Sequence, residues 1–283
     1  MEPYLKQLRE IRERGALKEQ RAVLASGVRP RILSIFGMQA RYDLRVGFPI
    51  VTTKRVPFKM VTEELLWFLS GSTNNNDLRE RGCSIWDEWA DPNTGELGPI
   101  YGQQWRRWRF TTPEGERGEW DQIRTLVNHI KQRVADPTAS CGRRLILSAW
   151  NPPEMPLTRG PSACHTLAQF DVTEDRLSCQ LYQRSADMFL GVPFNLASYA
   201  LLTHVLAQTV GLNVGELIHT MGDAHIYENH LPQVDEQLAR TPRPLPTLWI
   251  DPEIRDIDQF TSSSQVKLIG YDPWPTLKGE VAI

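Results

Sequence analysis

The sequence predicts an α+β fold, a single domain in which helices pack against one large mixed or antiparallel sheet. In some stretches apolar residues recur with helical spacing, and in others they alternate with polar residues as in strands. The chain has 283 residues and shows no internal repeat, low-complexity tract or linker. That length suffices for one large core. We therefore expect residues 1–283 to form one domain, with residues 1–32 as its N-terminal helix and loop.

The N-terminal half begins with a charged amphipathic pattern that predicts a helix over residues 1–20, with Gly15 as a candidate end. A basic loop at 21–32 follows; its arginines suit an anion, and a plain solvated loop fits the same residues. The elements expected next are strands at 33–44 and 49–53, a helix at 58–69, loops at 91–95 and 111–119, and a helix at 120–134.

The C-terminal half alternates between strand and helix patterns. A strand is expected at 145–150, and a proline-rich loop at 151–162 leads to Cys164. The remaining expected elements are strands at 167–172 and 176–184, a helix at 196–210 that Gly211 ends, and strands at 216–226 and 266–269.

The composition excludes several classes of protein. The net charge is −2, from 32 basic and 34 acidic residues, so no overall field attracts nucleic acid or a membrane. The four cysteines lack CxxC spacing, and we find no N-terminal apolar signal and no membrane-length apolar run. We expect a cytoplasmic protein with reduced thiols. No metal is expected, because the histidines lack the spacing of metal ligands. The sequence also contains no Rossmann or P-loop motif for nucleotide binding.

Glu64 lies about 60° from the centre of the apolar stripe of its predicted helix. Burial at this margin raises the pKa of a carboxyl group and suits it to proton transfer. A glutamate that extends into solvent is the commoner outcome for such a position.

Cys164 stands between small and polar residues, just before an apolar strand, and is the candidate nucleophile. A thiol with a pKa of about 8.5 needs nearby cations to ionise at neutral pH. Arg184, Arg143 and Arg144 are candidates for this role and for binding a phosphate, although Arg143 and Arg144 also fit plain surface charge. His165 is poorly placed as a base, because adjacent side chains on an extended segment point to opposite faces. Asn195 fits a helix N-cap equally well.

Eight segments, in order, resemble one known family. They are Leu65–Leu69, Ile85–Ala90, Cys164–His165, Leu177–Ser185, Phe189–Tyr199, Gly222–Tyr227, Arg243–Pro246 and Val281–Ile283. Together they resemble the folate-dependent thymidylate synthase family, from about residue 33 to the last residue. The resemblance implies that family's fold and a homodimer with 5,10-methylenetetrahydrofolate as one-carbon donor. It implies transfer of that carbon to C5 of a pyrimidine nucleoside monophosphate.

The resemblance also assigns roles. It implies that Cys164 adds to C6 of the pyrimidine, and that Glu64 and Tyr101 move protons. Substrate-binding roles fall on Gln183, Arg184, Ser185, Asn195, His225 and Tyr227, on Arg143 and Arg144 of the partner subunit, and on Arg29 or Arg31. Folate-binding roles fall on Ile85, Trp86, Trp89, Asp187, Leu190, Gly191, Phe194, Tyr271, Ala282 and Ile283.

Three departures from the family pattern leave the reaction open. The phosphate loop is replaced by Gly27–Ile32, Ala163 replaces the proline before the nucleophile, and His219–Asp223 replaces a Trp-Thr-Gly-Gly-Asp segment. Reductive methylation of dUMP is the first hypothesis, since Trp86 and the C-terminus shield the reactive methylene from water. Hydroxymethylation of dUMP, UMP, dCMP or CMP is the second, and a non-catalytic nucleotide- or RNA-binding relative is the third. Asn195 favours uracil, but a flipped carboxamide accepts cytosine.

Overall fold

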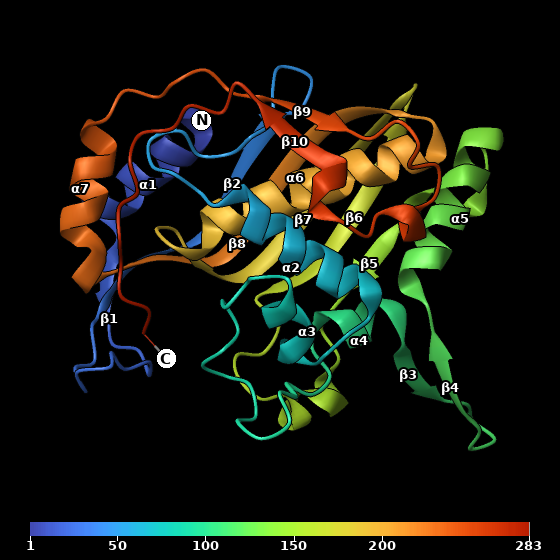
Figure 1. The fold of residues 1–283 in the computed structure, drawn as a ribbon, viewed down its shortest axis with the longest axis horizontal. Coiled ribbons are helices and arrows are strands. Elements are labelled where there is room, and N and C mark those ends of the chain that lie inside the picture. The colour runs from blue at the N-terminus through green and yellow to red at the C-terminus, as the bar shows by residue number, and fades with distance from the viewer. Residues whose placement is uncertain (283) are drawn as a thin grey trace.

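The computed structural model describes residues 1–282 and is built on one mixed six-stranded sheet (Figure 1). The order across the sheet is β1-β2-β8-β7-β6-β5. The strands are β1 (Ala16–Lys18), β2 (Ile32–Asp43), β5 (Ile146–Ser148), β6 (His165–Thr173), β7 (Arg176–Asp187) and β8 (Asn213–Tyr227). The expected fold class, a helix-covered mixed sheet, is confirmed.

Neighbouring strands of the sheet are antiparallel, except for β7 and β8, which are parallel. A parallel pair needs a crossover, and helix α6 (Gly191–Val210) supplies it. The crossover brings the end of β7 beside the end of β8, so that Asp187 pairs with His225 and Ser185 with Asp223. Residues 38 positions apart in the sequence therefore meet at one end of the sheet.

The helices cover one face of the sheet and share one continuous apolar core (Figure 1). They are α1 (Glu2–Arg14), α2 (Phe58–Ser70), α3 (Asn75–Glu80), α4 (Tyr101–Arg106), α5 (Gln122–Ala135), α6 and α7 (Leu231–Ala239). Most of α6 is buried, which explains its nearly uniform apolar composition. None of the helices described for residues 1–282 has the length and apolar character needed to span a membrane.

Two small hairpins lie outside the main sheet. One is β3 (Trp108–Thr111) with β4 (Arg117–Trp120), and the other is β9 (Thr247–Ile250) with β10 (Val266–Ile269). The first hairpin projects from the body of the molecule (Figure 1). It corrects the prediction of a loop at 111–119, which failed because these short exposed strands carry no apolar alternation.

Two further expectations about local structure are wrong. Residues 49–53 form no strand; they are a buried connection whose apolar side chains fill the core, and Thr52 bonds to the backbone of Arg243. The first helix ends at Arg14, before Gly15, and does not continue to residue 20 because residues 16–18 pair with β2. The remaining predicted helices and strands are confirmed within a few residues.

The opposite face of the sheet is uncovered and partly apolar. Leu167 and Tyr182 are direct partners on β6 and β7, and both are exposed. Ile146 on β5 and Phe36 on β2 are exposed as well, and Phe36 keeps 77% of its surface accessible. Large apolar side chains on one sheet face commonly mark a protein interface.

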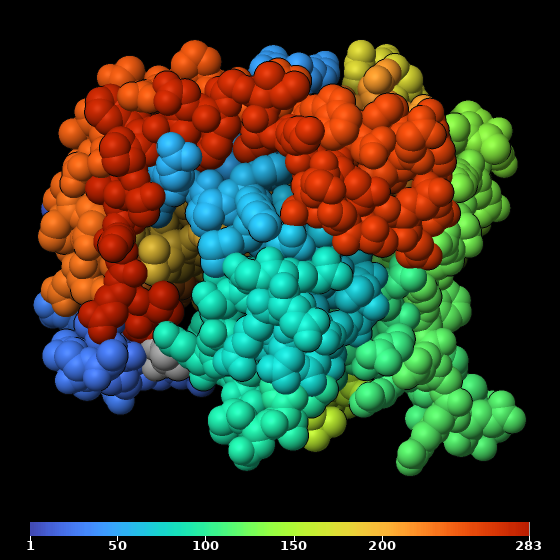
Figure 2. Space-filling model, viewed as in Figure 1, coloured from blue at the N-terminus to red at the C-terminus, as the bar shows by residue number. Residues whose placement is uncertain are grey.

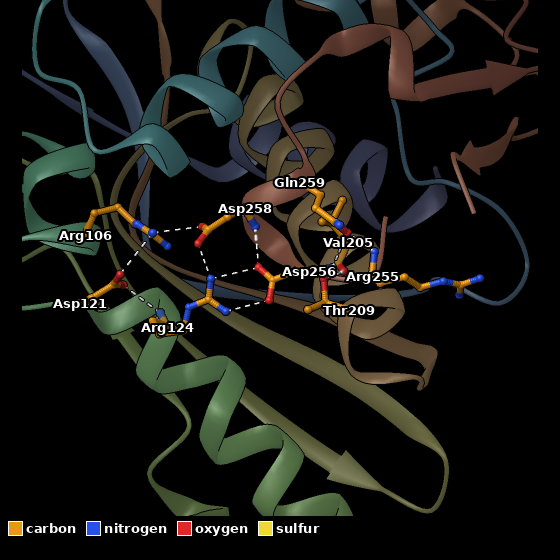
Figure 3. Close-up of polar contacts among 9 residues, drawn as sticks. All are labelled: Arg106, Asp121, Arg124, Val205, Thr209, Arg255, Asp256, Asp258 and Gln259. Carbon is orange, nitrogen blue, oxygen red and sulfur yellow. Dashed lines mark hydrogen bonds and ion pairs between the residues drawn. The ribbon is translucent and has the colours of Figure 1, made fainter. Parts of the chain in front are cut away.

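An ion-pair cluster joins the C-terminal region to helices α4 and α5 (Figure 3). Arg106 contacts Asp121 and Asp258 at 3.2 and 3.0 Å, and Arg124 contacts Asp256 at 2.8 Å. Asp121 also caps α5 by accepting a hydrogen bond from the backbone N–H of Arg124. Because Arg106 ends α4 and Tyr101 begins it, the cluster fixes one end of the short helix that carries Tyr101.

Candidate active site

Cys164 lies immediately before β6, and Arg184 on the neighbouring strand β7 holds its loop in place. The Arg184 guanidinium donates to the carbonyl oxygens of Ser162 and Ala163, at 2.7 and 3.0 Å. The same guanidinium lies 3.8 Å from the Cys164 Sγ, and the Arg184 backbone N–H donates to the Cys164 carbonyl. The sequence-based pairing of this thiol with Arg184 is therefore confirmed as a contact.

Burial raises the pKa of the Cys164 thiol, while the charges of Arg184 and Arg21 lower it. Burial is the larger effect on the pKa, and the Cys164 Sγ lies 3.7 Å from the Ser162 carbonyl oxygen. Activation of the thiol by nearby arginines stays a prediction. Arg143 and Arg144 do not act on it within the subunit; both are exposed in the segment before β5.

Tyr101 and His165 form a buried stack behind the thiol. The Tyr101 hydroxyl accepts a hydrogen bond from the Cys164 backbone N–H at 2.9 Å. The two rings are 3.9 Å apart and nearly parallel. Burial lowers the pKa of His165 to about 3, and its Nδ1 pairs with the Tyr199 hydroxyl. His165 is therefore neutral, and its Nδ1 is engaged by Tyr199.

Glu64 on α2 is 8% exposed and accepts a hydrogen bond of 2.7 Å from the Trp86 indole. Burial raises the pKa of its carboxyl group to about 7. The alternative of a glutamate extended into solvent is thus wrong, because the helix places this side chain inside the core. A carboxyl group with this pKa can release and take up a proton near neutral pH.

Asn195 lies in the first turns of α6, and its Oδ1 accepts a hydrogen bond of 2.9 Å from Gln183. It is not the N-cap, because the helix begins at Gly191. A Cβ atom on Gly191 would lie 3.7 Å from the Asp187 side chain and 3.8 Å from the Asn195 Oδ1. Glycine at this position therefore keeps the space between Asp187 and Asn195 open.

His225 and Tyr227 lie on one face at the end of β8, with ring centres 5.3 Å apart, as the sequence predicts. The His225 Nδ1 faces both the backbone carbonyl and the carboxylate of Asp223, which also accepts a hydrogen bond from Ser34. Two acceptors at Nδ1 require a proton on that nitrogen. Asp223 and Ser34 carry no motif of their own in the sequence, and the pairing of β2 with β8 brings them together.

Arg21 is the N-terminal arginine whose charge reaches the site, acting on both Cys164 and Tyr227. Arg21 lies in the basic loop expected at 21–32, for which the family resemblance offers Arg29 or Arg31 as the candidate phosphate ligand. Arg31 is paired with Glu228 at 2.9 Å, and Arg29 is exposed. Their role in binding phosphate stays a prediction.

A family model described as thymidylate synthase matches residues 2–283. This chain belongs to the thymidylate synthase family. It is therefore a folate-dependent one-carbon transferase that acts on a pyrimidine nucleotide, and its family uses 5,10-methylenetetrahydrofolate.

The residues expected to hold the folate in this thymidylate synthase family member suit a flat, partly apolar molecule. Ile85, Trp89, Leu190, Phe194 and Tyr271 are apolar or aromatic, pack against the core and stay partly exposed. Asp187 accepts hydrogen bonds from the backbone N–H groups of Phe189 and Leu190, which leaves its second oxygen available for a ligand. Figure 2 shows a hollow between the C-terminal segment and the helices around α2.

Two expected folate-binding residues need separate comment. The Tyr271 hydroxyl is already engaged, since it donates to the Val51 carbonyl and accepts from the Val56 N–H. Ile283 lies outside the described residues, and Ala282 is the last described residue. In the described part of the chain, no group of three or more His, Cys, Asp or Glu side chains is arranged to hold a metal ion.

Proposed function

We propose that this protein methylates dUMP at C5, giving dTMP, with 5,10-methylenetetrahydrofolate as the source of both the one-carbon unit and the hydride. The observation that supports this most strongly is the surroundings of Cys164. Arg184 contacts the Cys164 sulfur there, and the Tyr101 hydroxyl accepts a hydrogen bond from the Cys164 backbone N–H. The family's one-carbon transfer needs a nucleophile that adds to the ring and later leaves.

Cys164 is the nucleophile in this proposal. Its sulfur forms a bond to C6 of the uracil, the thiol proton leaves, and the ring electrons move to C5 and O4. Arg184 stabilises the thiolate at 3.8 Å, and a further arginine near the substrate phosphate is Arg21. The same sulfur leaves C6 in the last step and regenerates the double bond of the product.

Glu64 and Tyr101 manage the protons. The carboxyl group of Glu64, with a pKa of about 7, exchanges a proton with the pyrimidine edge through water. Tyr101, whose pKa burial raises well above its ordinary value, stays protonated and assists removal of the C5 proton as a hydrogen-bonding group. Trp86 is 7% exposed and lies over Glu64, so it excludes water from the reacting carbon and favours reduction of the exocyclic methylene over its hydration.

The phosphate-binding part of the proposal uses two subunits. Arg184, Ser185 and Arg21 approach the phosphate from one chain, and Arg143 and Arg144 of the partner subunit complete the site. The uncovered face with Phe36, Ile146, Leu167 and Tyr182 supports a homodimer, because a dimer would bury these apolar side chains. His225 and Tyr227 hydrogen-bond the sugar hydroxyl.

The proposal is tested by the mass of the product. The protein is incubated with 5,10-methylenetetrahydrofolate and, in separate reactions, dUMP, UMP, dCMP or CMP. We expect dUMP to gain one CH2, with dihydrofolate formed in equal amount. A gain of CH2O on any nucleotide replaces methylation with hydroxymethylation, and no gain on all four overturns both. Sedimentation of the protein checks the homodimer independently.

A further inference from the structure

His219 on β8 is fully buried and joins a short chain of side chains that ends at the proposed substrate site. Its Nε2 lies 2.9 Å from the Oε1 of Gln183 on the neighbouring strand β7. Its Nδ1 is buried and has no hydrogen-bond partner among residues 1–282. Burial lowers the pKa of His219 to about 3, so the ring is neutral and carries one proton.

The backbone determines which way the Gln183 amide points. Its Nε2 lies 3.0 Å from the Ser185 carbonyl oxygen. A carbonyl oxygen only accepts, so the group that faces it must be the NH2 group of Gln183. The Oε1 of Gln183 then faces His219. Since an acceptor needs a donor, the single proton of the imidazole lies on Nε2.

The same reasoning extends to Asn195. The second N–H of Gln183 donates to Asn195 at 2.9 Å, and the atom that receives it must be Oδ1. The Nδ2 group of Asn195 has no hydrogen-bond partner among the described residues, and it is not sealed from solvent. Asn195 therefore keeps an N–H donor at Nδ2 free for a ligand, while its Oδ1 is occupied by Gln183.

We propose that His219 is a positioning residue for base selection: through Gln183 it holds Asn195 with its amide N–H groups toward the pyrimidine. Position 4 of uracil is a carbonyl, which accepts from that donor. Position 4 of cytosine is an amino group, which would meet a second donor. The locked amide thus selects 4-oxo over 4-amino pyrimidines. This inference rests on the proposed function, in which a pyrimidine nucleotide lies against Asn195.

The orientation of Asn195 depends on a hydrogen-bond donor at position 219. Without a donor at this position the Gln183 Oε1 becomes a buried acceptor with no partner, which favours rotation of the Gln183 side chain away from Asn195. Asn195 is then free to turn its Oδ1 toward the base and accept from a 4-amino group.

The test compares binding of dUMP and dCMP by calorimetry, without folate, in wild type and three variants. His219→Phe keeps the ring but removes the N–H donor. His219→Gln restores a donor near the position of Nε2. His204→Phe is the matched control, because His204 is a second largely buried histidine, on α6, whose pKa burial lowers to about 4 and whose ring packs on Phe48.

We expect the wild type and His204→Phe to prefer dUMP strongly. In His219→Phe the ratio of the two dissociation constants falls by about tenfold or more, and His219→Gln recovers most of it. If His219 has only a structural role, its substitution weakens the binding of both nucleotides equally and leaves the ratio of their dissociation constants unchanged. If His219→Phe does not fold, His219→Met fills the same space without a donor and serves instead.

The outcomes separate the two proposals. A folded donorless variant that keeps the wild-type ratio overturns the role of His219 and leaves the proposed function intact. A wild-type protein that binds neither dUMP nor dCMP overturns the proposed function. A wild-type protein that prefers dCMP contradicts the amide orientation itself.

Discussion

Two carboxyl groups in this molecule, those of Glu64 and Asp256, have opposite surroundings and opposite pKa shifts. Glu64 is buried on α2 with one neutral partner, the Trp86 indole, and its pKa is raised to about 7. Asp256 lies about 35% exposed in the cluster of Figure 3, between Arg124 and a backbone N–H, and its pKa is lowered to about 2. The first carboxyl group exchanges its proton near neutral pH, and the second stays ionised.

The contrast shows that the fold keeps a reactive carboxyl group apart from the carboxyl groups that stabilise its structure. Burial without an opposite charge costs stability and yields a reactive group. Pairing with arginine contributes a little stability and keeps the carboxylate ionised, so that it cannot donate a proton near neutral pH. Helix α4 lies between the two groups, with Tyr101 at the reactive end and Arg106 at the paired end.

The largest effect is expected at the sulfur. Cys164→Ser removes the nucleophile, and we expect the rate of one-carbon transfer to fall by about 10⁴-fold or more, because a hydroxyl group is far less nucleophilic at neutral pH. Product formation measured by mass spectrometry checks this. Nucleotide binding should persist in the variant, and substantial residual turnover would exclude covalent catalysis by Cys164.

Glu64→Gln is expected to lower the activity but to raise the stability of the folded protein at high pH. The rate should fall by about 10²- to 10⁴-fold, because the amide cannot exchange a proton. The folded-state pKa is raised, so the folded wild type binds a proton more tightly than the unfolded chain, and its stability falls as pH rises from about 4.5 to about 7.

At pH 8 the Glu64→Gln variant should therefore be more stable than the wild type, by up to about 3 kcal/mol. At pH 4 the two proteins should be nearly equal, because Glu64 is then protonated in both folded and unfolded chains. Urea unfolding at the two pH values measures the difference. A variant that is less stable than wild type at pH 8 would contradict the burial argument.

Trp86→Phe should change the pH dependence of kcat and leave the protein folded. The indole N–H stabilises the ionised carboxylate, so its removal raises the pKa of Glu64 further. We expect the pH midpoint assigned to Glu64 in the kcat profile to move toward higher pH. The profile of Trp89→Phe is the control, because Glu64 receives its hydrogen bond from Trp86; equal shifts in both variants would reject the assignment.

The smallest effect is expected in the ion-pair cluster. Asp256→Asn keeps the side-chain oxygen that caps the backbone of Asp258 but loses the charge beside Arg124. Both partners are about a third exposed, so the loss at pH 7 should be below about 1 kcal/mol. Because the folded-state pKa is lowered, this stability is present above pH 4 and disappears toward pH 2. Thermal unfolding at pH 7 and pH 2.5 compares the two proteins, and a difference that grows at low pH would refute the ion pair.

Much of the fold was accessible from the sequence because local patterns survive folding. The apolar periods of α2, α5, β6 and β7 reflect which faces are buried, and Gly211 ends α6 in the left-handed conformation that glycine adopts freely. The sequence-based predictions fail where the local apolar pattern does not reflect the secondary structure. Residues 49–53 are apolar because they are buried, not because they pair, and the β3–β4 hairpin is exposed and shows no period.

The candidate site divides in the same way. By itself the sequence determined the kinds of residue present: one thiol before a strand, an arginine and an aspartate on the next strand, and motifs that carry the family resemblance. Only the tertiary structure decided that Arg21 acts on the thiol, that Glu64 is buried, and that Gln183 faces His219. The physical reason is that pKa values and amide orientations depend on neighbours brought together by the parallel β7–β8 pair and its crossover, and such neighbours are remote in the sequence.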